Sequence, residues 1–136
     1  MKRNIVKDIQ FLSRKSTLAN KNDSALITDL KDTLTAHSDE CIGLAANMIG
    51  ALKQVIIVDT GDGQLVMINP EIKRRSGKYE TQESCLSLLG SRGTIRYNEI
   101  EVKYQNEDFK TERRTFTGIT AQAIQHECDH LKGIII

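Results

Sequence analysis

Two histidines four residues apart near the end of the chain restrict its fold more than any other feature. They stand in His126-Glu127-Cys128-Asp129-His130, within a stretch whose apolar residues recur at helical spacing. Residues four apart on a helix project from one face, with about 5–6 Å between their Cβ atoms. Both imidazoles can therefore bind one ion, and the pentapeptide predicts a helix that carries a metal site.

Glu127 follows the first histidine, where its carboxylate can hold and deprotonate a metal-bound water. The alternative is a solvated helix that carries two histidines by chance. The chain has only three histidines and two of them stand in this motif, which favours the metal site. The residues alone thus predict a metallohydrolase in which Glu127 is the acid–base group.

The third ligand of this site has several candidates. A catalytic zinc or iron site uses three protein ligands and keeps one position open for water. The residues after His130, LKGIII, offer no ligand, so the third ligand lies upstream. Cys128 projects from another side of the helix, which leaves Cys41, Cys85 and His37, with several carboxylates behind them. Two imidazoles and one thiolate suit zinc or ferrous iron, and spacing alone does not choose between the two cysteines.

Each candidate also has a purely structural interpretation. Cys41 is expected to be a small core residue, His37 to end a helix in solvent, and Cys85 is equally well explained as a buried structural thiol. The N-terminal residues, MKRNIVKDIQFLSRKS, have no continuous apolar stretch typical of a signal peptide, so we expect a cytoplasmic, reducing location. There the three cysteines stay thiols, and metal binding is open to them.

Length and charge exclude other classes of protein. The 136 residues fit one domain, 1–136, with no repeat or linker. A net charge of +1 argues against a nucleic acid or an anionic membrane surface as partner. No apolar run reaches the roughly 20 residues that span a bilayer.

Periodicity predicts two main helices. Residues 23–37 have apolar side chains at helical spacing, with Asp23 or Ser24 as the N-cap. The last helix is expected to start near residue 117 or 118 and to end before Gly133, a suitable residue after a helix end. Its expected buried face consists of Ile119, Ala123, Ile124 and Leu131. Residues 5–15 are weakly amphipathic, and we expect a short helix there, followed by a loop over 16–24.

The middle of the chain predicts strands. Residues 54–59 are rich in β-branched side chains, residues 61–63 form a turn, and residues 65–69 return as the second strand of a hairpin. Residues 71–82 are polar and predict an exposed strand or loop. Two further strands are expected over 95–105 and 113–117. Because the strands and helices do not alternate strictly, the pattern favours an α+β fold.

Three segments, taken in order, resemble the peptide deformylase family. The family's G-x-G-L-A-A-x-Q corresponds to residues 41–48 (CIGLAANM), its E-G-C-L-S to residues 83–87 (ESCLS), and its H-E-x-D-H to residues 126–130 (HECDH). The stretches QVIIVD and LVMINPEI are similar to the family's hairpin. The resemblance extends from about residue 24 to the C-terminus.

The resemblance implies an α+β fold with antiparallel or mixed sheets packed around the central helix that bears the two histidines. It implies Cys85, His126 and His130 as metal ligands, with Fe²⁺ as the usual ion and Zn²⁺, Ni²⁺ or Co²⁺ able to replace it. It also implies removal of the N-formyl group from formyl-methionine at the start of peptides or nascent chains, with the ribosome as a candidate partner.

The resemblance also implies how the oxyanion is stabilised, and here the chain departs from the family. The implied donors are the backbone N–H of Leu86 and the side-chain amide of the glutamine in the first motif, near Gly43. That glutamine is Met48 here, and a thioether donates no hydrogen bond. The neighbouring Asn47 is expected to direct its amide elsewhere. The loss of one such donor typically costs on the order of 10²–10³ in turnover.

Two other positions depart from the family's motifs, because Cys41 and Ser84 replace glycines. Three hypotheses follow from the changed positions. The first is an active deformylase with reduced turnover, the second a hydrolase redirected to another small acyl amide, and the third a non-enzymatic metal-binding paralogue that binds peptides or ribosomes. The intact Cys85, His126, His130 and Glu127 favour the first.

Overall fold

The computed structural model describes residues 1–136 and has the predicted α+β architecture. Its elements, in chain order, are α1 (Ile9–Leu12), the 3-10 helix η1 (Lys21–Asp23), α2 (Ser24–Ala36), β1 (Gly43–Ala45), the 3-10 helix η2 (Ala46–Ile49), β2 (Val55–Asp59), β3 (Gln64–Glu83), β4 (Arg92–Gln105), β5 (Thr111–Thr117) and α3 (Gly118–Leu131). The strands form one antiparallel sheet in the order β1-β2-β3-β4-β5.

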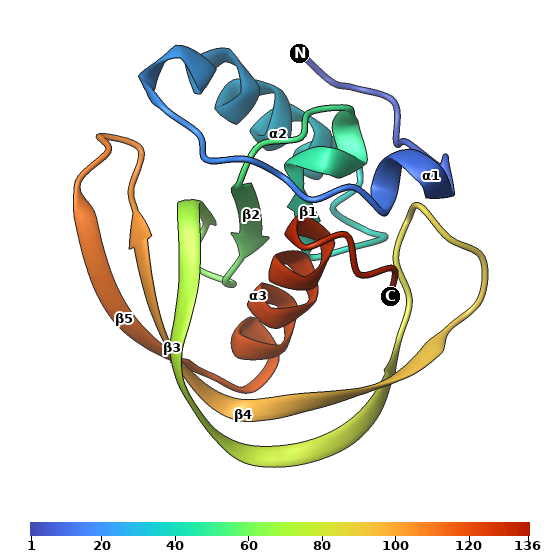
Figure 1. Cartoon of the computed structure of the whole chain (residues 1–136), viewed down its shortest axis with the longest axis vertical. Helices are drawn as coiled ribbons and strands as arrows, with labels where there is room; N and C mark the ends of the chain where they lie inside the picture. The colour runs from blue at the N-terminus through green and yellow to red at the C-terminus, as the bar shows by residue number, and fades with distance from the viewer.

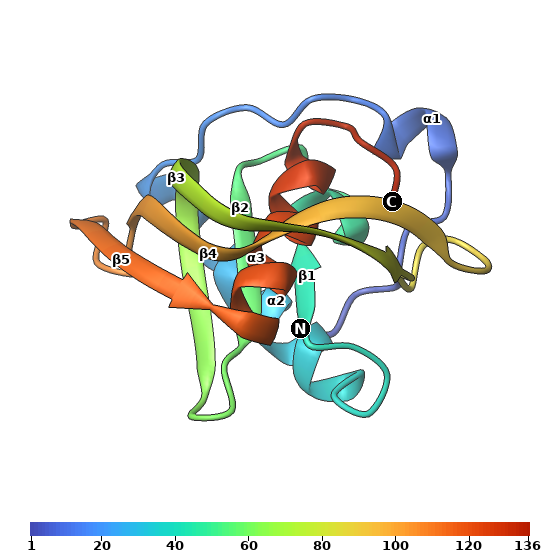
Figure 2. The same cartoon turned by 90° about the horizontal axis from the view of Figure 1, so that it is seen from below.

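The sheet bends around α3. The long hairpin of β3 and β4 curls beneath the helix, whereas β1 and β2 lie on its other side next to α2 (Figures 1 and 2). α3 contacts β1, β2 and β4, so it is enclosed by the sheet as the resemblance implied. Fully buried side chains such as Leu30, Ile56 and Ile124 join α2, β2 and α3 into one core cluster of 25 residues.

β3 continues to Glu83, far beyond the predicted strand over 65–69, and passes Pro70 at an irregularity in the sheet. Proline has no N–H for the ladder, so within a sheet it is tolerated at a bulge. The pairing of β3 with β4 shifts register between Ile68 and Glu71. Asn69 adopts a positive φ of 52° there, and its side-chain amide donates to the Ala19 carbonyl at 3.1 Å. The strand then resumes through the polar residues 71–82, which are exposed strand and not loop.

The two main helices confirm the predicted ranges, with differences at their ends. Asp23 is the N-cap of α2, but its side chain accepts from the Asn20 N–H and does not cap the helix. Gly133 follows α3 with a φ of +78° and lies against the backbone of Ser13, as a glycine beyond a helix end can. The first helix is only four residues long, and none of the helices is both long and apolar enough to cross a membrane.

Candidate metal centre

The structure brings Cys85, His126 and His130 together. One donor atom from each lies within 4.8 Å of the others, and the two imidazole rings have centroids 4.7 Å apart. Both histidines are buried on α3, while Cys85 is half-buried just after the end of β3. Of the other candidate ligands, His37 bonds to Glu40 at the end of α2 and takes no part in this cluster.

The cluster fits a divalent metal ion. Nε2 of His130 is buried and has no hydrogen-bond partner in the protein, which is expected of an atom that serves as a metal ligand. Nδ1 of His126 lies 2.7 Å from Oε1 of Glu83, so its Nε2 is left for the ion. One thiolate and two imidazoles suit zinc or ferrous iron. A carboxylate behind a ligating histidine is also the usual outer partner in such sites.

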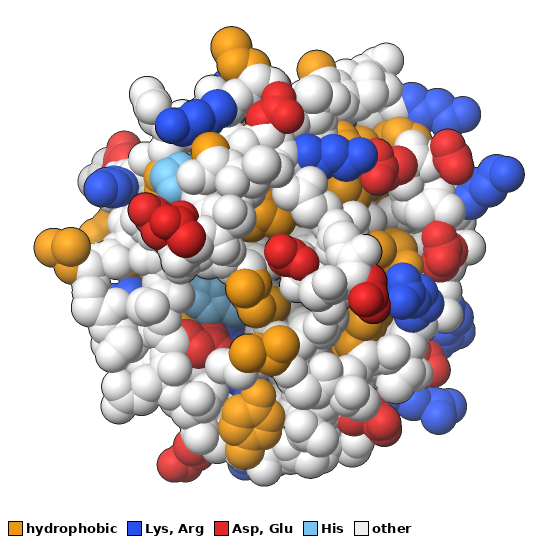
Figure 3. Space-filling view, turned by 180° about the vertical axis from the view of Figure 1, so that it is seen from behind, with side chains coloured by type: hydrophobic (Ala, Val, Ile, Leu, Met, Phe, Trp, Pro, Cys, Tyr) orange, Lys and Arg blue, Asp and Glu red, His pale blue; other side chains and the backbone are white.

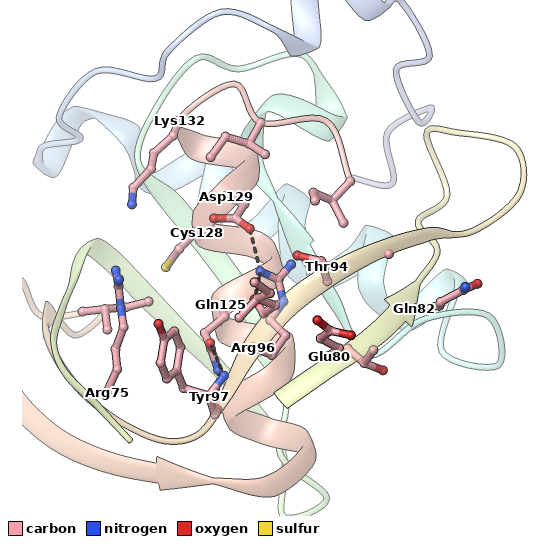
Figure 4. Close-up of a pocket in the computed structure, with 16 residues that line it drawn as sticks. Arg75, Glu80, Gln82, Thr94, Arg96, Tyr97, Gln125, Cys128, Asp129 and Lys132 are labelled. Atoms are coloured by element: carbon pink, nitrogen blue, oxygen red, sulfur yellow. Dashed lines mark hydrogen bonds and ion pairs between the residues drawn. The ribbon is translucent and has the colours of Figure 1, made fainter. Parts of the chain in front are cut away.

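Glu83 is the centre of a buried network behind the ligands. Its carboxylate receives two hydrogen bonds from Arg96, at 2.9 and 2.7 Å, and one from Gln122 at 2.9 Å. Arg96 also bonds to Asp129 at 2.7 Å (Figure 4). Burial opposes the charge of Glu83, but the bonds from His126, Arg96 and Gln122 outweigh it and lower the pKa of this carboxyl to about 2. The network fixes the ring of His126.

The environment favours positive charge on one histidine and not on the other. Burial opposes protonation of His126, yet its bonds to Cys85 and Glu83 raise its pKa to about 10. Metal binding would release this proton, because a ligating imidazole is neutral. Burial and the charge of His126 lower the pKa of His130 to about 4, while the backbone of Ile136 opposes this shift. His130 is therefore a neutral imidazole at pH 7, which is the form that binds metal.

Glu127 is buried beside the ligands, and Oε1 of its carboxylate has no hydrogen-bond partner. Burial raises its pKa to about 7, although the charge of His126 opposes the shift. A general acid–base group works best when its pKa is near the working pH. β1 passes close to this side chain at Gly43, and the glycine has no Cβ to clash with it. An added Cβ would lie 3.0 Å from Oε2 of Glu127.

The remaining predicted residues line the wall of the same cavity. Met48 is buried and Leu86 half-buried, and both border a cavity of about 400 Å³ with Cys85, His126 and Glu127. The backbone N–H of Leu86 donates to none of the backbone carbonyls. Figure 3 shows a histidine recessed below the surface, with acidic and hydrophobic side chains around it.

The expectation that Ile119 is buried is wrong. Its side chain, in the first turn of α3, is 70% exposed and borders the cavity. The other three predicted positions of this face, Ala123, Ile124 and Leu131, are buried. Cys41 packs partly against the core and also borders the cavity, although it is not one of the three clustered donors.

A larger cavity, of about 840 Å³, lies on another face of α3. Cys128, Gln125 and Asp129 border it, together with Arg75 and Tyr97 (Figure 4). Cys128 therefore faces away from the two histidines, as its position on the helix predicted. Gln125 bonds through its amide to the backbone of Tyr97, at 2.9 and 2.8 Å, and so attaches α3 to β4.

Sequence reasoning missed the network of Glu83, Arg96, Gln122 and Asp129. Two of these residues stand inside the motifs, which was a usable signal. A carboxylate two positions before a candidate ligand is a natural outer partner for a ligating histidine. Arg96 also carried a signal, because it shares the alternation of β4 with the apolar Ile100, Val102 and Tyr104, which are buried.

Comparison with protein families agrees with this geometry. The family model described as polypeptide deformylase matches residues 3–136. A peptide deformylase of Clostridium beijerinckii is 53% identical over 132 residues, which is 97% of each chain. One from Alkaliphilus metalliredigens is 39% identical over 130 residues, covering 94% of this chain and 88% of the relative.

Solved structures show the same likeness. A peptide deformylase from Thermotoga maritima superposes with a TM-score of 0.89 at 29% identity, over 99% of this chain and 94% of the other. The actinonin-bound class I type b enzyme of Acinetobacter baumannii gives a TM-score of 0.89 at 27% identity, over 99% and 95%. With the family model spanning nearly every residue, the chain belongs to the polypeptide deformylase family.

Proposed function

We propose that Cys85, His126 and His130 hold the ion with which this metal-dependent deformylase removes the N-formyl group from formyl-methionyl peptides. The observation that carries the assignment is the convergence of these three donors, within 4.8 Å of one another, beside a cavity that Cys85 and His126 line together with Glu127. We further propose Fe²⁺ as the resident ion, with Zn²⁺, Ni²⁺ or Co²⁺ able to replace it, because one thiolate and two imidazoles suit these metals.

A bound divalent ion acts as a Lewis acid and lowers the pKa of its water. Glu127, with its unbonded Oε1 in the cavity, takes a proton from the attacking water and later gives it to the leaving amine. The C–N bond of the formamide breaks, and formate and a free amine are released. The N–H of Leu86 is the proposed donor to the oxyanion that forms on the formyl oxygen.

Met48 and Gly43 are the proposed substrate contacts of the opposite wall. The buried thioether of Met48 adds apolar surface but no hydrogen bond. The substrates are peptides or nascent chains with a formyl-methionine end, and we place the reaction in the cytoplasm, at or near the ribosome. The same Met48 supports a second candidate function, the hydrolysis of a different small acyl amide.

Formate release from formyl-Met peptides by the anaerobic, iron-loaded protein tests the proposal. We expect Cys85→Ser to lose both the ion and the activity. Cys41→Ser, in the same cavity, and Cys128→Ser, on the other face of α3, serve as matched controls that keep the ion. If the wild type binds iron and releases no formate, deformylation is excluded. A panel of acyl peptides then separates the redirected hydrolase from a non-enzymatic paralogue.

A further inference from the structure

The side chain of Asn47 joins the wall of the cavity to the helix that carries the histidines. Asn47 lies on η2 and is completely buried. Its Nδ2 donates to the backbone carbonyl of His130 at 2.9 Å, across 83 positions of sequence. The other atom of the amide, Oδ1, has no partner. The only hydrogen bond of the Asn47 side chain is therefore to the backbone of His130, the residue proposed as a metal ligand.

The carbonyl of His130 lies in the last turn of α3, where carbonyls lack a partner within the helix. The N–H of Gly133 donates to it at 3.0 Å, and Asn47 provides a second donor from outside the helix. Removal of Asn47 thus leaves a bond within the local turn but breaks the connection between this turn and η2.

The two histidines are held in different ways. The ring of His126 is fixed through its own Nδ1, which bonds to Glu83 at 2.7 Å. No side chain bonds to the ring of His130, and its Nε2 is without a partner, so the only group that bonds to the ring is the backbone of Ile136. The direction in which His130 presents Nε2 therefore depends on where the backbone at the end of α3, and of the residues after it, is held.

We propose that Asn47 is a positioning residue for the metal ion, through its hydrogen bond to the backbone of His130. The inference rests on the proposed role of His130 as a ligand. Asn47 holds His130 by a hydrogen bond to its backbone, whereas Glu83 holds His126 by a hydrogen bond to its ring. The partners behind a ligand typically change metal affinity by about 10–100-fold when they are lost.

A variant without the donor but of similar size tests this role. Asn47→Leu removes the amide and fills the same space. Thr33→Val is the matched control, because Thr33 is also completely buried and its hydroxyl donates to the Asp29 carbonyl at 2.7 Å, within α2, while it accepts from the Arg3 N–H at 2.9 Å. Both changes remove a buried bond from a side chain to a backbone carbonyl.

The probe is Co²⁺, whose visible absorption spectrum reports the geometry of its ligands. We expect Asn47→Leu to weaken Co²⁺ binding at least tenfold in competition with a chelator and to change the absorption spectrum. Thr33→Val should lower the free energy of unfolding without either effect. If Asn47→Leu does not fold, Asn47→Ser gives the same test, because its side chain is too short to reach the carbonyl.

Equal Co²⁺ affinity and an unchanged spectrum in the Asn47 variant would overturn the inference. So would an equal loss of affinity in Thr33→Val, because metal binding would then only follow stability. His130→Ala separates this result from the proposed function. If His130→Ala binds Co²⁺ like the wild type, the ligand assignment itself is wrong. If it loses Co²⁺ while Asn47→Leu keeps it, only the role of Asn47 is disproved.

Discussion

The two walls of the metal cavity differ in how their polar groups are bonded. On the ligand wall, formed by the end of β3 and one face of α3, the carboxylate of Glu83 is bonded to His126, Arg96 and Gln122. The opposite wall consists of residues 41–48, among which Met48 borders the cavity. The only side-chain amide of this wall, that of Asn47, donates to the backbone carbonyl of His130 and not into the cavity. The proposed ligands and Glu127 thus lie on one wall and Met48 on the other, so mutations can test the two sets of residues separately.

The largest effect is expected on the ligand wall, from Glu127→Gln. An amide cannot take up the proton, so formate release should fall by about 10²–10⁴-fold. Metal content should stay at the wild-type level, because Glu127 is not one of the three clustered donors. Formate assays and elemental analysis of the same sample measure both. A variant that loses the ion would show that this carboxylate helps to bind it.

Met48→Gln is the corresponding change on the opposite wall, and it should increase activity. The new amide provides an oxyanion donor, and one such donor is typically worth on the order of 10²–10³ in turnover. The measurement is kcat for a formyl-Met peptide. Met48→Leu is the control, because it keeps an apolar side chain of similar volume and adds no donor. An equal gain in both variants would attribute the effect to cavity shape.

Gly43→Ala tests the contact between the two walls. An added Cβ would lie 3.0 Å from Oε2 of Glu127 and 3.2 Å from the Ile57 carbonyl, so the carboxylate must shift. A displacement of this kind costs on the order of 10² in turnover, with the ion retained. Gly93→Ala in β4 is the control, since no atom lies within 4 Å of its added Cβ. Unchanged turnover in Gly43→Ala would mean that Glu127 has room to adjust.

The smallest effect concerns stability in acid. The bonds to His126, Arg96 and Gln122 outweigh burial and lower the pKa of Glu83 from 4.5 to about 2. This carboxylate therefore stabilises the fold above pH 4.5, and its contribution is lost as the pH falls from 4.5 towards 2. At about 1.4 kcal/mol per pKa unit this contribution is at most about 3 kcal/mol at neutral pH, and solvent screening reduces it to about 2 kcal/mol. Denaturant unfolding of Glu83→Gln and wild type should differ at pH 6 and converge near pH 2.

Glu99→Gln, on the exposed face of β4, is the control for this measurement and should leave the unfolding curve unchanged at both pH values. A difference between Glu83→Gln and wild type that persists at pH 2 would show that the side chain stabilises the fold by its shape and not by its charge.

The sequence predicted the elements whose pattern is local. Apolar residues at helical spacing located α2 and α3, and the four-residue interval placed His126 and His130 on one face. Helical geometry also excluded Cys128 as a metal ligand, because it projects from another side of α3. The choice between Cys41 and Cys85 required a family resemblance, because no spacing rule relates a cysteine at the end of a strand to a helix far along the chain.

Other features depend on contacts that no local pattern encodes. The bond between Arg96 and Glu83 joins residues that are not paired in the sheet, since the register of β3 and β4 pairs Glu83 with Arg92 and Tyr79 with Arg96. Periodicity correctly put Ile119 on the same side of α3 as Ala123 but could not show that Ile119 itself stays exposed while Ala121, in the same turn, is fully buried. The residues 5–15 formed only a four-residue helix, since their amphipathic pattern was weak.

The position of Cys85 just beyond the end of β3 has a consequence for folding. Between it and His126 lie the whole of β4 and β5 and the first part of α3. An ion bound by both residues would join the two ends of this stretch in the folded protein. Because the unfolded chain has no preformed site, the free energy of metal binding would add to the stability of the fold. We therefore expect chelation to speed amide hydrogen exchange in β4 and β5 before α2 is affected.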